Sequence, residues 1–187
     1  NLFDAAYIRE QTDLPFLLRA DTQRFLRESD LVEGGGEESF YVWDELAAAL
    51  GRLPYDTAEQ VAATEAVLIA GLPSPDSMND VDSAALIGSA RGFESLTRTV
   101  RAKKLPALGA RTWDLLRWAA TAQRPAADPR SVLTRRLAMA ALVTGNQATS
   151  SVVERGLLDA DTEVRRIAAT AAAIDTTISD REALLKR

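Results

Sequence analysis

Apolar residues recur every three or four positions along most of the chain, with polar residues between them. This spacing is typical of amphipathic α-helices. No alternating run of four or more β-branched residues occurs, so no strand is expected. The pattern predicts helices over Leu2 to Glu10, Leu14 to Glu28, Phe40 to Gly51, Ala58 to Gly71, Ser83 to Lys103, Ala110 to Ala122, Asp128 to Val143, Ser150 to Leu158, Arg165 to Ala171 and Asp180 to Arg187.

Glycine and proline mark the predicted breaks between these helices. Gly51 suits the position just after a helix end, with Pro54 following it. The segment Glu33 to Ser39 contains three consecutive glycines, which predicts a mobile loop that proteases cut first. Pro106 and Gly109 separate the long helix over 83–103 from the next one.

Two segments of the chain match at an offset of 30 residues. Arg135-Arg136 precedes an alanine-rich stretch, and Arg165-Arg166 precedes another. Between them lies a short amphipathic segment that ends in the turn Asp159-Ala160-Asp161. Self-similarity at a period of a few tens of residues is typical of stacked helical pairs. The small residues of both stretches predict close helix contacts, and replacing Ala141 or Ala169 by leucine should overpack them.

Asp159, Val164 and Arg165 carry a resemblance to a known family. An Asp in a turn, a Val five positions later and an Arg directly after it resemble the turn and second helix of a HEAT repeat. The preceding segment, residues 152–158, resembles the first helix of that repeat, and the match covers about sixty residues. The resemblance implies an all-α fold, a right-handed α-α superhelix or HEAT-like solenoid related to armadillo-like folds. Asp and Arg near the turn can then bond exposed backbone groups and one another between successive repeats.

We interpret residues 1–187 as a single HEAT-like repeat domain, with its clearest repeats in 110–187 and divergent helical pairs in 1–104. Asp180 to Arg187 resembles the start of another first helix, so we expect the chain to be a fragment of a longer repeat array. The alternative is an irregular helical bundle with one alanine-rich hairpin. Trp113 and Trp118 lie on a helix that is apolar over more than half its surface, which predicts a position between neighbouring helices.

The composition of the chain excludes several kinds of catalytic, metal-binding and disulfide site. The chain has no Cys and no His, so disulfides, Cys/His zinc sites and Ser-His-Asp triads are excluded. Adjacent carboxylates on a helix point in different directions, and no glycine-rich phosphate loop is present. We therefore expect no enzyme activity, no catalytic or metal-binding residues and no cofactor. No apolar run approaches the length that spans a membrane, and the compartment stays open between the cytoplasm and export after processing.

Charge is distributed unevenly along the chain. Residues 1–90 carry 5 basic and 17 acidic side chains, whereas residues 91–136 carry 11 basic and 3 acidic ones. We call residues 91–136 the basic block. A binding face is expected on the second helices, and a partner protein with an acidic surface would suit it. The candidate partner-binding residues are Arg91, Arg98, Arg101, Arg135 and Arg165.

Two functions remain open at this point. The first is a non-catalytic scaffold for protein–protein interaction, because solenoids offer extended surfaces. The second is nucleic-acid binding through the basic block, either alone or in base excision by a HEAT-like glycosylase. Trp113, Asp114, Arg117 and Trp118 supply the residue types that base excision needs. However, Asp114 and Arg117 are spaced to pair on the helix surface, aromatic residues are few, and the acidic half repels phosphates, so nucleic acid is the less favoured partner.

Overall fold

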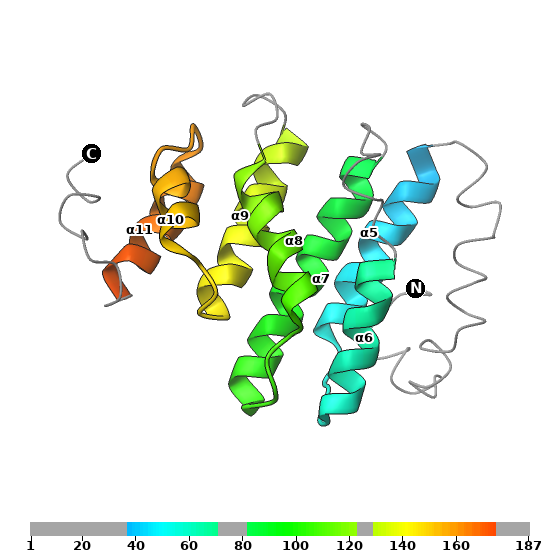
Figure 1. Ribbon diagram of the computed structural model, residues 1–187. Coiled ribbons are helices and arrows are strands. Elements are labelled where there is room, and N and C mark those ends of the chain that lie inside the picture. The colour runs from blue at the N-terminus through cyan, green and yellow to red at the C-terminus, as the bar shows by residue number, and fades with distance from the viewer. Residues whose placement is uncertain (1–36, 71–81, 123–128, 175–187) are drawn as a thin grey trace. The chain divides into compact units, whose positions relative to one another are not determined.

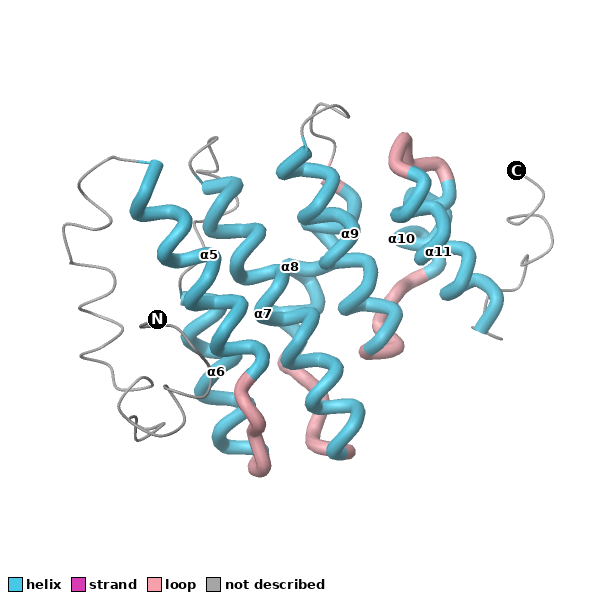
Figure 2. The backbone as a smooth tube through the Cα atoms, turned by 180° about the vertical axis from the view of Figure 1, so that it is seen from behind, coloured by secondary structure: helices cyan, strands magenta, loops and turns pink. Residues whose placement is uncertain are grey.

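The computed structural model describes residues 37–70, 82–122 and 129–174. These residues form seven α-helices, labelled in Figure 1, and the described part of the chain contains no strand. Figure 2 shows the same helices joined by loops. The prediction of an all-α fold is confirmed for these residues. The predicted helices over 2–10, 14–28 and 180–187 lie outside the described residues, and so does the predicted loop over 33–39 as far as residue 36. The prediction is wrong for Glu37–Ser39, because these residues begin the helix Glu37–Arg52, which the sequence pattern starts at Phe40.

The chain divides into two compact units, Asn1–Pro106 and Ala107–Arg187. The boundary falls between the two ranges into which the sequence pattern separates divergent and clear repeats. The assignment of one repeat domain to the whole chain stays a prediction. Each unit has its own buried residues.

The first unit contains α5 (Glu37–Arg52), α6 (Ala58–Ala70) and α7 (Asp82–Lys103). Helix α7 packs against both α5 and α6. Phe93 and Leu96 of α7 are fully buried, as are Leu68 of α6 and Tyr55 of the α5–α6 loop. The Tyr55 hydroxyl donates a hydrogen bond to the Leu50 carbonyl, and burial raises the pKa of Tyr55 to about 12.

The prediction that Gly51 lies just after the end of α5 is wrong. Gly51 does not follow the helix, because α5 continues to Arg52. Gly51 is buried against Gly92 of α7, where the two backbones touch. The absence of a side chain is therefore required by packing between helices and not by the conformation of a helix end. The chain turns after Arg52, close to Pro54.

The second unit contains α8 (Ala110–Thr121), α9 (Pro129–Thr144), α10 (Ser150–Leu157) and α11 (Thr162–Ile174). Helices α8 and α9 form one pair and α10 and α11 form the next, with further contacts from α8 to α10 and from α9 to α11. Gly156 of α10 fits between Met139 of α9 and Ala168 of α11, where a side chain would clash with both. The second pair is thus packed directly onto the first.

Small side chains provide much of this contact, as the alanine pattern predicts. Ala138 and Ala141 of α9 are fully buried, and so are Ala168 and Ala172 of α11. Ala169 is an exception, because it is only partly buried. The alanine-rich face of α11 is therefore centred one position away from the residue chosen by sequence. Trp113 is buried and donates a hydrogen bond from Nε1 to the Leu108 carbonyl oxygen (2.8 Å).

Candidate functional site

The turn between α10 and α11 holds two aspartates that organise the start of α11. The Asp161 carboxylate accepts hydrogen bonds from the backbone N–H groups of Glu163 (3.1 Å) and Val164 (3.0 Å). It therefore caps α11 and satisfies donors that a helix start leaves without partners. The Asp159 carboxylate accepts the N–H of Asp161 at 2.8 Å and holds the turn itself.

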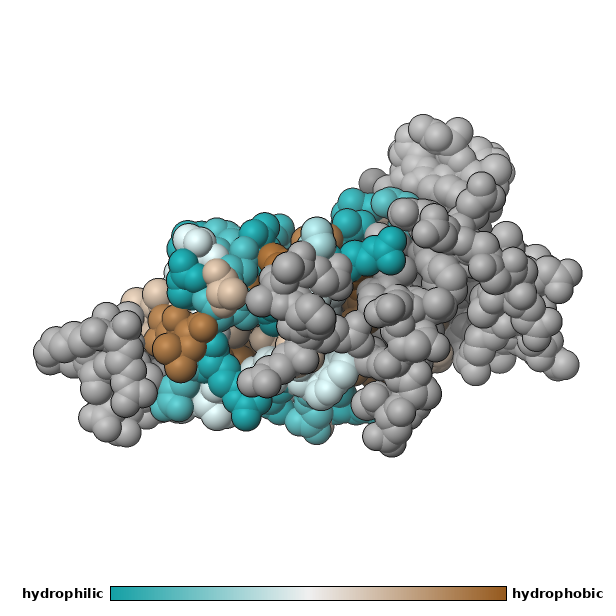
Figure 3. Space-filling view, turned by 90° about the horizontal axis from the view of Figure 1, so that it is seen from above, coloured by the Kyte–Doolittle hydropathy of each residue, from teal (hydrophilic) through white to brown (hydrophobic). Residues whose placement is uncertain are grey.

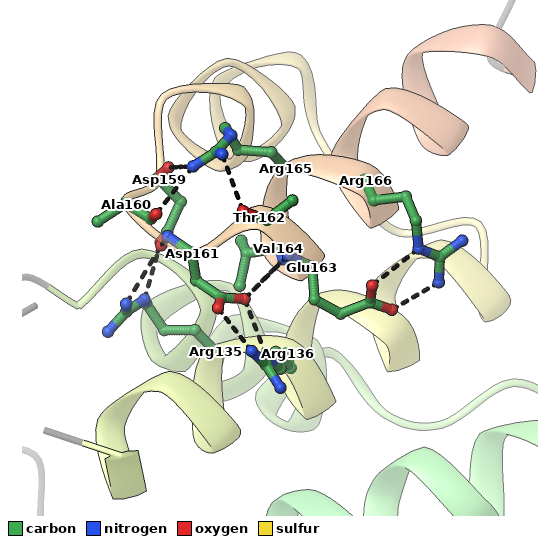
Figure 4. Close-up of polar contacts among 10 residues, drawn as sticks. All are labelled: Arg135, Arg136, Asp159, Ala160, Asp161, Thr162, Glu163, Val164, Arg165 and Arg166. Atoms are coloured by element: carbon green, nitrogen blue, oxygen red, sulfur yellow. Dashed lines mark hydrogen bonds and ion pairs between the residues drawn. The ribbon is translucent and has the colours of Figure 1, made fainter. Parts of the chain in front are cut away.

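Two arginines of α9 bind these aspartates from the preceding helical pair (Figure 4). Arg135 donates from Nε and Nη2 to the two carboxylate oxygens of Asp159, at 2.8 and 3.2 Å. Arg136 binds Asp161 in the same two-point manner, at 2.8 and 2.6 Å. Such paired bonds fix the orientation of both groups. The bonds that the sequence predicts between Asp and Arg near the turn are present here.

The electrostatics of the two pairs differ with their burial. The Arg135 side chain is 6% exposed and that of Asp159 is 12% exposed, so the pair lies in the interior. The Arg136 side chain is 42% exposed. Hydrogen bonds from its guanidinium hold the pKa of Asp161 well below its usual range, and the α11 N–H groups lower it further. Asp161 is therefore ionised throughout the neutral range.

Arg165 and Val164 complete the turn from the α11 side. Val164 is fully buried. Arg165 donates from Nη1 to the carbonyl oxygens of Asp159 and Ala160, both at 2.8 Å, and from Nη2 to the Thr162 hydroxyl at 3.0 Å. The three positions that carry the HEAT resemblance thus meet at one turn. We name Asp159, Asp161, Arg135, Arg136 and Arg165 the turn cluster.

The turn cluster is only partly what the sequence singles out. Arg136 and Asp161 are absent from the candidate residues, although they contribute as many bonds as Arg135 and Asp159. Their signal is present in the sequence as the second member of the repeated Arg-Arg pair and the second Asp of the turn. Arg135, proposed as a partner-binding residue, is instead buried and bound to Asp159 and Ser131, so its side chain is not available to a partner.

Arg91, Arg98 and Arg101 lie along α7 in the other unit. Arg91 forms an ion pair with Glu45 of α5 (3.8 Å), and Arg98 pairs with Glu94 one turn earlier (2.5 Å). Arg98 keeps 69% of its side chain exposed, and Arg101 is exposed as well. These two are the candidate partner-binding residues of α7 that face solvent most.

Much of the basic block is paired within the chain. Besides the arginines already described, Lys103 pairs with Asp56, and Arg117 pairs with Asp114 at 2.8 Å. At least six of the eleven basic residues of the block therefore bind a carboxylate in the described part of the chain. The Asp114–Arg117 pair is the one expected from helical spacing, and it accounts for two of the residue types considered for base excision.

Neither a metal centre nor a membrane span is found among the described residues. Within 37–70, 82–122 and 129–174, no three His, Cys, Asp or Glu residues are grouped so as to hold a metal ion. Over the same ranges, the helices lack the length and apolar character needed to cross a bilayer.

Comparison with known proteins finds short similarities to three oxidoreductase subunits. The chain is 58% identical over 43 residues to perchlorate reductase subunit alpha of Dechloromonas aromatica (strain RCB). It is 50% identical over 48 residues to dimethylsulfide dehydrogenase subunit alpha of Rhodovulum sulfidophilum, and 52% identical over 42 residues to chlorate reductase subunit alpha of Ideonella dechloratans.

These matches are local on both sides. They cover 22 to 26% of this chain and 5% of each relative. The chain thus spans about a twentieth of the length of the curated relatives it matches. No family model matches the chain, and no solved structure matches it.

Proposed function

We propose that this chain is a module of HEAT-like helical repeats that binds another protein and has no catalytic activity of its own. The observation that carries the proposal is the turn cluster. Two successive helical pairs are joined by Arg135 to Asp159 and by Arg136 to Asp161, and the Arg-Arg pair recurs 30 residues later. Stacking of this kind supports a right-handed solenoid, which offers binding surface along its length.

The charge distribution supports a protein partner over nucleic acid. Phosphate binding depends on several cations that can exchange counterions for phosphates. In the basic block, most of the arginines that lie on helices already bind carboxylates of the chain. Arg98 keeps 69% of its side chain exposed although it pairs with Glu94, and Arg101 is exposed as well, so both can contact an acidic protein surface.

The test uses the full chain as an immobilised bait, compared with an Arg98→Glu/Arg101→Glu variant and an Arg155→Glu control. Arg155 is exposed on α10, outside α7. We expect a protein that the parent and the control retain and the α7 variant loses, with binding then measured on the purified partner. Retention of duplex DNA with a steep dependence on salt, and of no protein, would overturn the proposal.

A second candidate function rests on the three relatives. Identities of 50 to 58% over more than 40 residues support a common origin for the matched residues, and on this ground the chain would be part of an oxidoreductase subunit. The natural full-length protein would then copurify with further subunits and reduce perchlorate or chlorate, or oxidise dimethylsulfide. If the full-length protein is inactive on all three compounds and copurifies with no redox partner, only the scaffold proposal stands.

A further inference from the structure

We draw no further inference here: the strongest candidate, the exposed apolar side chains of Leu158 and Ile174 on the α10–α11 pair, whose hydrophobic surface shows among hydrophilic residues in Figure 3, carries none, because nothing in the described part of the chain shows what covers it.

Discussion

Gly51 of α5 and Gly92 of α7 bring two helix backbones into direct contact. A methyl group added at Gly51 would lie 2.1 Å from the Gly92 carbonyl oxygen, and one added at Gly92 would lie 2.6 Å from the Ala47 carbonyl oxygen. Backbone atoms cannot move aside as a side-chain tip can. The approach of α5 to α7 therefore depends on both glycines.

Gly51→Ala should lower the free energy of unfolding by about 1–3 kcal/mol, because the added methyl forces the helices apart. In a helix with open space around the glycine, the same substitution stabilises by roughly 0.5–1 kcal/mol. The sign of the change in stability therefore shows whether the Gly92 backbone blocks the added methyl group. Urea denaturation of the full chain measures it, with Gly92→Ala as a parallel variant. A gain in stability for Gly51→Ala would contradict the contact.

Arg135→Ala should cost about 3–5 kcal/mol, because it leaves the Asp159 carboxylate largely buried without its cation. Arg135→Lys should also destabilise, since an ammonium group cannot reproduce the two-point geometry of the guanidinium. The control is Arg155→Ala on the exposed surface of α10, expected to stay within about 0.5 kcal/mol of the parent. Equal effects of the Arg135 and Arg155 variants in chemical denaturation would refute a structural role for Arg135.

Asp161→Ala should lower stability by about 1–2 kcal/mol through the lost helix cap alone, and further through the lost ion pair with Arg136. Asp161→Asn keeps the helix cap and removes the charge, so its free energy of unfolding should lie between those of the parent and the alanine variant. The difference between Asp161→Asn and Asp161→Ala measures the cap at neutral pH.

Acid should lower the stability of the parent protein through protonation of Asp161. The folded pKa of Asp161 is held below its ordinary value, so its stabilising contribution is present above about pH 4 and declines as the pH falls toward the folded pKa. The stability gap between the parent and Asp161→Asn should therefore narrow from pH 5 to pH 2. A gap that stays constant over this range in urea denaturation would argue against the Arg136 bond.

Leucine at the buried alanines should overpack the second unit. Ala141→Leu and Ala168→Leu should each cost about 1–3 kcal/mol, because both side chains are fully buried. Ala169→Leu should cost less, since Ala169 is partly exposed and the equivalent position of α9 holds Met139. Thermal unfolding of the three variants ranks them. A larger loss at Ala169 than at Ala168 would mean that the buried face of α11 is assigned incorrectly.

The full chain should bind duplex DNA with a dissociation constant above about 1 µM at physiological salt, because at least six of the eleven basic residues of the basic block already bind a carboxylate of the chain. Fluorescence anisotropy with a labelled duplex measures this. Tighter binding that is lost in Arg98→Glu/Arg101→Glu would instead support the nucleic-acid alternative.

Helix positions were accessible from sequence because they depend on local periodicity. The predicted range over 83–103 corresponds to α7 at 82–103, and 58–71 corresponds to α6 at 58–70. The Asp159 turn was also visible, since capping and turn residues act on their own neighbours in the chain. The preference for glycine just after a helix end gives a wrong prediction at Gly51. Close packing of two helix backbones also requires a glycine, and this is the reason for the glycine at position 51.

Local patterns in the sequence predict the helical class, the order of the described helices, the 30-residue repeat and the residue types of the turn cluster. The tertiary structure is needed to see which arginines bind a carboxylate from a distant part of the chain and which stay in water or pair within their own helix. Arg98 and Arg135 both belong to the basic block, yet one is 69% exposed and the other is buried against Asp159. The physical reason is that the burial of Arg135 and the pairs between helices depend on contacts between residues more than twenty positions apart, and no local pattern of polar and apolar residues encodes such contacts.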